Sequence, residues 1–543
     1  MTLCLGLDCS TQSLKLVVLD LSSLRPLFAE SVRFDDLPFG TVGGVHRRVD
    51  ALDGAHTVTA PPSMWLAALD AGLLQLKKRG CPMDKIRAVS GSAQQHGSVF
   101  WRTGASRLLA KLRSPDAAAA ERPLNEVLDA NLCFSRLDSP VWMDNSTSMQ
   151  CQEITAAMGG AQALANLTGS SAFERFTGAQ IRRFNATQPD AYAQTERISL
   201  VSSFLASLFI GDYAPIDCAD GSGMNLLDFR AHDWSDAALD ATAPGLRARL
   251  GGVAAHPFGT VGLVSRYAQQ RFGFGSQCLV NTFSGDNPCS CAGLPLHKGD
   301  IGISLGTSDT LFAVYDTPSP VADAGHVFCS ATHPDTYMAL LCFKNGSLVR
   351  EDFRNRLCGG SWSQFSQMLQ QTPPGNGGQV GFFFADPEIL PRNAHGVARF
   401  DADDRAVEQF DAAADVRALV ESQFLSMRLH ASKLGISKAP LGRLLLTGGA
   451  STNAAIAQVA ADVFGAPVVV AESADSAARG AAYLAALTYK RAFEGGFFPV
   501  AFETVIPALL TEPIARPNEV AHAAYTALLP RFEKLQSSVS VSP

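Results

Sequence analysis

Two segments rich in small and hydroxyl-bearing residues each follow an apolar run, at residues 3–7 and at residues 301–305. Backbone N–H groups in tight turns and short hydroxyl side chains bind phosphate oxygens well, because they approach without steric bulk. One such segment is also typical of an ordinary polar turn, but the same arrangement in both halves of the chain favours a phosphate site. The candidate phosphate ligands are Ser10, Thr11, Gln12, Gly306, Thr307 and Ser308.

Two aspartates stand where apolar strands are expected to end. Asp8 closes the first apolar run, and a carboxylate there could hold Mg²⁺ directly or through water, because hard divalent cations take oxygen ligands. Asp286 follows the strand-like residues 280–285 and precedes Asn287 and Pro288. Phosphoryl transfer to an alcohol needs a carboxylate that accepts the hydroxyl proton, which makes Asp286 a candidate general base. A helix N-cap, with a proline suited to the first helical position, explains Asp286 equally well, and the two roles are compatible.

A sugar substrate needs several hydrogen-bonding partners in a concave site, and three segments offer them. They contribute Gln95 and His96 from residues 90–97, Trp142 and Asp144 from residues 141–145, and Arg175 from residues 173–178. Each segment also has a structural explanation: a lone histidine is more often structural, Trp142 suits a core, and Arg175 suits a salt bridge.

A strand-like run at residues 443–447 leads into a glycine turn and then a helical run. Gly448, Gly449 and Ala450 would let the backbone lie flat against a purine or a ribose, with the next helix starting behind them at Asn453. A plain turn between a strand and a helix has the same pattern, and both interpretations stay open.

Alternating strands and helices must position these residues. Residues 3–8 and 14–20 predict a hairpin, which residues 301–305 and 311–316 repeat. Residues 64–78 have helical apolar spacing and precede another strand-like run, as in α/β domains. A chain of 543 residues exceeds the size at which one core stops growing, so two domains are expected.

The composition is that of a globular protein, with 47% hydrophobic residues, 17% charged residues and a formal net charge of −7. Without clustered Lys and Arg, a nucleic-acid partner is not expected, and no run of about 18 uncharged apolar residues could span a membrane. The first residues lack a basic leader, so we expect a cytoplasmic protein without a secretory signal. Cysteines without a CxxC pair favour buried reduced thiols.

Together these motifs resemble those of the FGGY family of carbohydrate kinases, and within it the animal-type xylulose kinases. The resemblance covers nearly the whole chain, and it implies an α/β, two-domain, actin-like ATPase (ribonuclease H-like) fold with an interdomain cleft. It is most specific at residues 94–97, 140–144, 174–178, 285–288, 304–310 and 448–451. The implied domains are a sugar-binding one at residues 1–290, a nucleotide-binding one at residues 291–500 and a C-terminal extension at residues 501–543.

The resemblance implies ATP- and Mg²⁺-dependent phosphorylation of D-xylulose to D-xylulose 5-phosphate, with Asp286 as the general base for the 5-hydroxyl. The implied sugar contacts are His96, Arg175, Asp286 and Asn287, with Gln95 and Asp144 beside them. The implied nucleotide contacts are Thr11, Thr307, Gly449, Ala450 and Asn453, with Trp362 near the nucleotide. Residue chemistry alone adds Gln12, Gly306, Ser308 and Gly448 to the nucleotide candidates and makes Asp8 the candidate metal ligand. Many relatives carry Arg two places after the acid of the Trp-x-Asp segment, whereas this chain has Ser146.

Two other classes of function are compatible with the same motifs. Another kinase of the family, such as a ribulokinase or a glycerol kinase, would keep the hairpins and change the sugar contacts, although the Gln-Gln-His-Gly loop favours a ketose. An actin-like chaperone or filament ATPase would hydrolyse ATP without a small acceptor. A sugar sensor without activity is disfavoured by Asp286. We expect a monomer or a homodimer.

Overall fold

A computed structural model describes residues 1–254, 256, 258–436, 441–471, 475–493, 500–507 and 511–539 of the chain. The chain forms two compact units, each assembled from segments that are not contiguous in sequence. Unit 1 comprises Met1–Pro295, Phe328–Asp335 and Asp475–Pro507, and unit 2 comprises Leu296–Val327, Thr336–Ala474 and Ala508–Pro543. The continuous domains expected at residues 1–290 and 291–500 stay a prediction.

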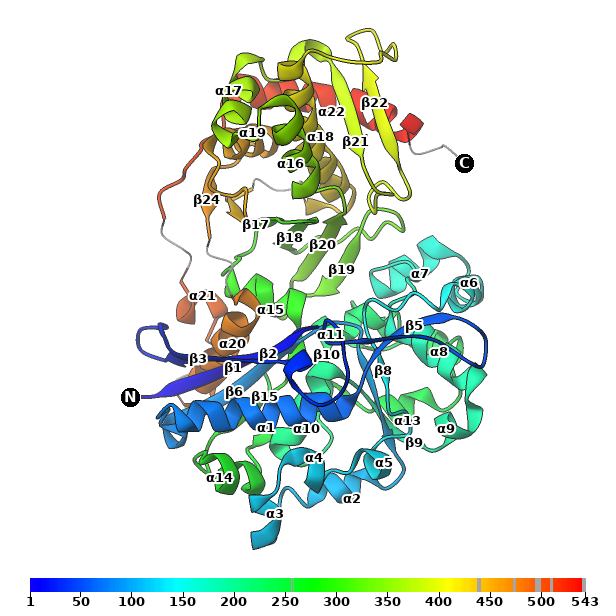
Figure 1. Cartoon of the computed structure of the whole chain (residues 1–543), viewed down its shortest axis with the longest axis vertical. Coiled ribbons are helices and arrows are strands. Elements are labelled where there is room, and N and C mark those ends of the chain that lie inside the picture. The colour runs from blue at the N-terminus through cyan, green and yellow to red at the C-terminus, as the bar shows by residue number, and fades with distance from the viewer. Residues whose placement is uncertain are drawn as a thin grey trace. The chain divides into compact units, whose positions relative to one another are not determined.

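A mixed seven-stranded sheet forms the core of unit 1 (Figure 1). Six strands follow the order β14-β15-β6-β1-β2-β3, and β16 pairs with β6. β1 and β2 form the antiparallel hairpin that the sequence predicts, and β6 runs parallel to β1. The strands are β1 (Leu3–Cys9), β2 (Ser13–Asp20), β3 (Pro26–Arg33), β6 (Ile86–Ala93), β14 (Thr260–Leu263), β15 (Leu279–Asn281) and β16 (Ser284–Gly285).

One face of this sheet is covered by the helix that the sequence predicts near residues 64–78. Side chains alternate between the two faces of a strand, so Leu3, Leu5 and Leu7 of β1 point the same way. They are fully buried in a core to which α1 (Pro62–Lys78) and α10 (Val201–Ile210) contribute. The apolar side chains at alternate positions of β1 therefore determine the face of the sheet on which α1 and α10 pack.

The opposite face of the sheet packs against α20 (Ser476–Phe493) at very short distances. A Cβ atom on Gly6 would lie 2.1 Å from a carbonyl oxygen of α20. α20 also packs against α15 (Asp286–Gly293), where a Cβ atom on Gly480 would lie 1.8 Å from the carbonyl oxygen of Cys289. Such spacing leaves no room for a side chain, so glycine is required at both positions. This packing holds the start of α15, and with it Asp286, against the sheet.

Smaller elements of unit 1 carry the remaining candidate residues. A three-stranded sheet, three two-stranded sheets and several short helices flank the central sheet. They include β4 (His46–Val49), β5 (His56–Ala60), β8 (Ser139–Pro140), β7 (Ser98–Arg102), β9 (Thr195–Leu200), α8 (Thr177–Thr187), β10 (Ile216–Asp217), α11 (Cys218–Gly221) and the 3₁₀ helix η3 (Ser222–Met224).

Unit 2 is built on a mixed six-stranded sheet in the order β19-β20-β18-β17-β23-β24, although the last two residues of β19 belong to unit 1 (Figure 1). β17 and β18 form the second antiparallel hairpin that the sequence predicts, and β17 runs parallel to β23. The strands are β17 (Ile301–Leu305), β18 (Asp309–Tyr315), β19 (His326–Cys329), β20 (Tyr337–Phe343), β23 (Leu444–Thr447) and β24 (Val468–Val470). The helices of this unit include α16 (Ser347–Leu357), α17 (Trp362–Gln371), α18 (Ala412–Lys433), α19 (Ala454–Phe464) and α22 (Glu519–Val539).

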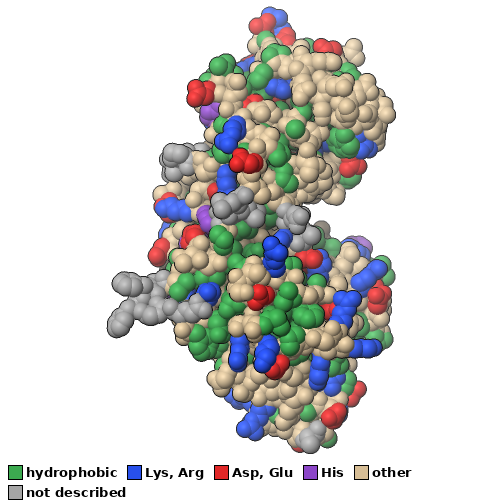
Figure 2. Space-filling view, turned by 90° about the vertical axis from the view of Figure 1, so that its left-hand side faces the viewer, with side chains coloured by type: hydrophobic (Ala, Val, Ile, Leu, Met, Phe, Trp, Pro, Cys, Tyr) green, Lys and Arg blue, Asp and Glu red, His purple; other side chains and the backbone are tan. Residues whose placement is uncertain are grey.

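The surface carries charges of both signs, intermixed with hydrophobic side chains on the face that Figure 2 displays. In the described ranges of the chain, no helix is long and apolar enough to cross a membrane. All twelve cysteines lie in the described ranges, none of them forms a disulfide, and all except Cys342 are buried. This is the state that the cysteine pattern predicts.

Candidate active site

Asp8 lies at the carboxyl end of β1, beside β6. The parallel register places it opposite Ser92, whose Oγ donates a hydrogen bond to Asp8 Oδ1 at 3.0 Å. Only 7% of Asp8 is exposed, and burial raises the pKa of its carboxyl group, whereas Lys15 lowers it. A carboxylate has about four acceptor positions, so the Ser92 contact leaves capacity for a cation or its waters.

Asp286 is the first residue of α15, and Gly285 occupies the N-cap position. The N-cap interpretation of Asp286 is therefore wrong, and Pro288 is the third helical residue instead of the first. Asp286 Oδ1 accepts hydrogen bonds from the backbone N of Asn287 at 2.9 Å and from its Nδ2 at 3.2 Å. Burial and the nearby Asp8 raise the pKa of Asp286 to about 7. A group that titrates near neutral pH suits general-base catalysis.

Two further aspartates, which the sequence pattern did not reveal, are buried on β10 and α11. Asp217 accepts a hydrogen bond from Ser284 Oγ, and Asp220 accepts one from Ser202 Oγ at 2.5 Å. Burial raises the pKa of Asp217 to about 7 and that of Asp220 to about 8. The available signal was their close spacing ahead of the Gly-Ser-Gly run at residues 221–223.

Gln95 connects one of these aspartates with the predicted base. Its Nε2 donates to Asp220 Oδ1 at 3.4 Å, and its Oε1 accepts from Asn287 Nδ2 at 2.8 Å. A backbone hydrogen bond from Gln95 also reaches the carboxylate of Asp286 and lowers its pKa. The structure thus brings Gln95, Asn287 and Asp286 together, and both ends of the Gln95 amide bind protein groups.

His96 adopts a left-handed backbone, with a φ of 69°. Such a conformation costs a residue other than glycine roughly 1–3 kcal/mol, and residues strained in this way cluster at active sites and ligand-binding sites. The ring stacks on Phe176 with 4.6 Å between centroids, and Nδ1 lies 2.8 Å from the carbonyl oxygen of Gly223. A carbonyl partner requires a proton on Nδ1, so in the neutral ring Nε2 is an acceptor for a hydroxyl group.

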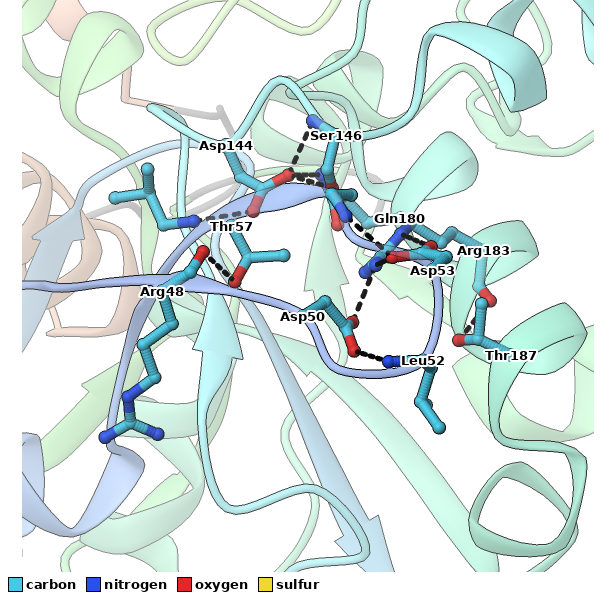
Figure 3. Close-up of polar contacts among 12 residues, drawn as sticks. Arg48, Asp50, Leu52, Asp53, Thr57, Asp144, Ser146, Gln180, Arg183 and Thr187 are labelled. Carbon is cyan, nitrogen blue, oxygen red and sulfur yellow. Dashed lines mark hydrogen bonds and ion pairs between the residues drawn. The ribbon is translucent and has the colours of Figure 1, made fainter.

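Asp144 is almost fully buried, and its carboxylate holds a turn together (Figure 3). Val58 N donates to Oδ2 at 2.8 Å, and Gln180 Nε2 donates to Oδ1 at 2.8 Å. Ser146, the residue that departs from the family pattern, donates to Oδ1 from its backbone N at 3.0 Å and from its Oγ at 2.5 Å. Protein donors therefore surround Asp144, and its contact with a sugar stays a prediction.

Arg175 is half-buried, and its Cζ lies 5.7 Å from the ring centroid of Phe173. The carbonyl oxygen of the preceding residue, Glu174, accepts a hydrogen bond from Gln180 Nε2 at 3.1 Å. Because the same nitrogen binds Asp144, the turn that carries Arg175 is tied to the carboxylate of Asp144.

Trp142 is 42% exposed, so its interpretation as a core residue is wrong. Its Nε1 donates to Thr11 Oγ1 at 2.8 Å, which satisfies the indole N–H at the surface of the hairpin tip. Because Thr11 Oγ1 accepts this hydrogen bond, its own hydrogen is available for a phosphate oxygen. Gln12 is exposed next to Thr11.

In unit 2, the hairpin tip at residues 306–308 lies beside the glycine turn that follows β23, and its two hydroxyl-bearing residues are exposed. Gly448 has a φ of 85°, and a Cβ atom on it would lie 2.5 Å from the carbonyl oxygen of Leu305. Gly449 faces open space, and Ala450 is half-buried. Unit 2 thus joins two segments that the sequence assigns to the nucleotide.

Asn453 caps α19, and its Oδ1 accepts hydrogen bonds from two backbone N–H groups of that helix. Its Nδ2 donates to Ser366 Oγ on α17 at 3.0 Å. Trp362 is the first residue of α17, and the Cζ of Arg354 lies 4.8 Å from its ring centroid. This cation–π contact and the Asn453 hydrogen bond fix Trp362 relative to the glycine turn.

The residues present could hold Mg²⁺ only if the protein supplies few of its ligands. Among the residues that the structure describes, no group of three or more His, Cys, Asp or Glu side chains could hold a metal ion. Mg²⁺ commonly binds through one or two carboxylates and completes its octahedron with water and substrate phosphates. Asp8, a buried carboxylate at the end of β1 with a single side-chain donor among the described residues, Ser92, fits that mode.

Comparisons with known proteins agree along nearly the whole chain. Residues 137–293 and 301–489 match the N-terminal and C-terminal domains of the FGGY family of carbohydrate kinases. The chain is 48% identical over 541 residues to the xylulose kinase of Mus musculus, covering 99% of this chain and 94% of the mouse protein. It is 49% identical over 541 residues to the xylulose kinase of Rattus norvegicus, covering 99% of this chain and 97% of the rat protein.

Solved structures match at lower identity. A structure described as a xyloylose kinase from Brucella ovis has a TM-score of 0.75 and 20% identity and covers 99% of each chain. Gluconate kinase from Lactobacillus acidophilus has a TM-score of 0.76 and 16% identity and covers 100% of this chain and 99% of its own. These matches confirm the predicted actin-like fold of two α/β units, and they leave the sugar open because enzymes named for different sugars match equally well. By its domain matches and its rodent relatives, this chain belongs to the FGGY family of carbohydrate kinases.

Proposed function

We propose that the protein phosphorylates D-xylulose at its 5-hydroxyl, using ATP and Mg²⁺, to give D-xylulose 5-phosphate. The observation that carries this proposal is the 48–49% identity to two rodent xylulose kinases across 99% of the chain. The arrangement of His96, Asn287 and Asp286 supports it, because they combine hydroxyl acceptors with a base in one part of unit 1.

Asp286 is the proposed general base. Its carboxylate accepts the proton of the 5-hydroxyl as the sugar oxygen attacks, which is the main demand that this reaction makes on a side chain. With a pKa of about 7, Asp286 is a stronger base than an ordinary aspartate and is still partly ionised at neutral pH. Nε2 of His96 and Oδ1 of Asn287 accept hydroxyl hydrogens of the sugar, and the guanidinium of Arg175 donates to its oxygens.

The nucleotide residues divide into phosphate ligands and contacts to the base and ribose. ATP supplies the phosphoryl group, and Mg²⁺ neutralises charge on its oxygens. Asp8 binds the cation or its waters, and Thr11, Thr307 and Ser308 donate hydrogen bonds to phosphate oxygens. Gly449, whose surface is open, and Trp362 contact the nucleoside.

A coupled assay of ADP release tests the proposal with the native chain and Asp286→Ala. We expect D-xylulose to stimulate turnover more than other pentuloses, hexuloses, gluconate or glycerol, and removal of Mg²⁺ to abolish it. Asp286→Ala should lose the stimulation, whereas Asp84→Ala, which changes an exposed aspartate beside Lys85, should retain it. Preference for another substrate would reassign the sugar, and ATP turnover that no sugar changes would overturn the kinase assignment.

A further inference from the structure

Asp220 is 2% exposed, and its two carboxyl oxygens have different partners. Ser202 Oγ on α10 donates to Oδ2 at 2.5 Å, and Gln95 Nε2 approaches Oδ1 at 3.4 Å. Gln95 in turn accepts from Asn287, whose Nδ2 also donates to Asp286 Oδ1. A chain of hydrogen bonds therefore leads from a buried acid to the two residues at the start of α15.

The direction of these hydrogen bonds follows from Asp220. Oδ1 of Asp220 can only accept when the carboxyl group is ionised or carries its proton on Oδ2. It then requires the NH₂ group of Gln95 to face it, and so the carbonyl oxygen of Gln95 faces Asn287. Asn287 must then present its own NH₂ group to Gln95 and to Asp286. Its Oδ1 is left as the acceptor for a substrate hydroxyl. With Gln95 reversed, Asn287 would turn an oxygen toward the carboxylate of Asp286, which is unfavourable.

We propose that Asp220 is a positioning residue for the sugar phosphorylation: it sets the orientation of the Gln95 amide and thereby keeps Asn287 bonded to the base Asp286. This inference rests on the proposed ketose kinase function. Asp220 acts through Gln95 and Asn287 and does not itself bind the sugar.

The backbone around Asp220 keeps the hydrogen-bonded chain in place. A Cβ atom on Gly285, at the end of β16, would lie 2.5 Å from Cγ of Gln95 and 2.8 Å from Oδ1 of Asp220. The strand end thus packs directly on the Gln95 and Asp220 pair, and neither side chain has room to swing toward it. Close packing around a polar network is what allows a buried group to transmit its orientation.

The protonation state of Asp220 is consistent with this role. Burial raises its pKa to about 8, so the carboxyl group keeps a proton near neutral pH. When Oδ2 carries the proton, the hydrogen bond to Ser202 reverses, so that Oδ2 donates and Ser202 Oγ accepts. Oδ1 remains the acceptor for Gln95. Gln95 can therefore donate to Oδ1 of Asp220 whether or not the carboxyl group of Asp220 is protonated.

Steady-state kinetics of Asp220→Ala, Asp220→Asn and Ser202→Ala test the inference, alongside the native chain. Alanine removes the acceptor, and we expect kcat with D-xylulose to fall at least about tenfold, because small misplacements of reacting groups are costly. Asparagine can keep an oxygen toward Gln95, and Ser202→Ala leaves that contact intact, so both should stay within about threefold of native kcat. The KM for ATP should stay near native in all three variants.

Further measurements distinguish a loss of kcat caused by unfolding from one caused by the lost hydrogen bond. Thermal unfolding of each variant shows whether it is folded at the assay temperature. If Asp220→Ala is not folded, Gln95→Met, which keeps the side-chain length and removes both amide ends, should show the same loss of kcat. Native kcat in folded Asp220→Ala or in Gln95→Met, or a loss in Asp220→Asn equal to that in alanine, would overturn the inference. A native chain that phosphorylates no sugar would instead overturn the proposed function.

Discussion

Arg350 and Asp309 form a bidentate ion pair in unit 2, with Nη1 to Oδ2 at 2.6 Å and Nη2 to Oδ1 at 2.8 Å. Both side chains are 1% exposed. Asp309 is the first residue after the hairpin tip at residues 306–308, and the backbone N of Ser347, at the start of α16, donates to the carbonyl oxygen of Gly306 at 2.8 Å. The ion pair thus anchors one side of the predicted phosphate-binding tip.

Removal of the cation alone should be strongly destabilising. Arg350→Met leaves a buried carboxylate without its partner, so we expect unfolding in urea to require about 3–5 kcal/mol less free energy than in the native chain. The KM for ATP should also rise because the hairpin tip loses its support. Arg356→Met is the matched control on the same helix, because the Arg356–Asp352 pair is more than half exposed and such pairs contribute about 0.3–0.5 kcal/mol. An equal decrease in the free energy of unfolding in the two variants would contradict the conclusion that burial makes loss of the Arg350–Asp309 pair costly.

The pKa of Asp286 predicts the pH dependence of turnover. The base works only when ionised, and burial together with Asp8 raises its pKa to about 7, so the rate should fall as the pH is lowered through this region. A cation bound at Asp8 offsets the negative charge that raises the pKa. The acidic limb of kcat/KM for D-xylulose should therefore lie at lower pH with saturating Mg·ATP than with subsaturating Mg·ATP. A rate that is flat from pH 5 to 8 under both conditions would exclude Asp286 as a base with a raised pKa.

Local sequence patterns were sufficient for the hairpins and for the glycine turn. In β1, the alternation of Leu3, Leu5 and Leu7 with smaller residues already indicates a strand that is buried on both faces. The requirement for glycine at Gly448 follows from a left-handed backbone, and a strand-turn-helix pattern reveals such a position. These features depend on neighbours in sequence, which is why they could be predicted.

Features that depend on distant contacts could not be predicted in the same way. Asp220 lies 125 residues from Gln95, and its surroundings in sequence show only a short acidic and glycine-containing run. The sequence of α20 predicts an Ala-rich helix. No neighbouring residue in the sequence indicates that Gly480 packs on Cys289 in unit 1. Residue type alone predicts a core position for Trp142, whereas a hydrogen bond to Thr11 Oγ1 satisfies its indole N–H at the surface.

The contacts of Asp144 predict a stability effect that a purely sugar-binding residue would not have. Asp144→Ala removes the acceptor for Val58, Ser146 and Gln180, and each buried donor left unpaired costs about 1–3 kcal/mol. We expect the free energy of unfolding to drop by at least about 2 kcal/mol. The KM for D-xylulose should rise as well, because Gln180 also holds the carbonyl oxygen of Glu174 beside Arg175.

Ser146→Ala serves as the control for Asp144, because it removes one donor and leaves the acceptor in place. It should lose less stability than Asp144→Ala and keep a KM near native. Urea unfolding and initial rates over a range of D-xylulose concentrations measure both quantities. A raised KM with unchanged stability in Asp144→Ala would instead favour direct contact between Asp144 and the sugar.

The hydrogen bond from Trp142 to Thr11 can be tested with a double-mutant cycle. Trp142→Phe removes the donor, so the Thr11 hydroxyl is no longer held with its hydrogen free for a phosphate oxygen. A hydrogen bond of about 0.5–1.5 kcal/mol corresponds to a rise of about two- to twelvefold in the KM for ATP. Thr11→Ala should raise it at least as much, and Thr11→Ser, which keeps the hydroxyl, should not. If Trp142 acts through Thr11, adding Trp142→Phe to Thr11→Ala should change nothing further, because the hydroxyl is already absent. Strictly additive effects would show that Trp142 affects ATP binding by another route.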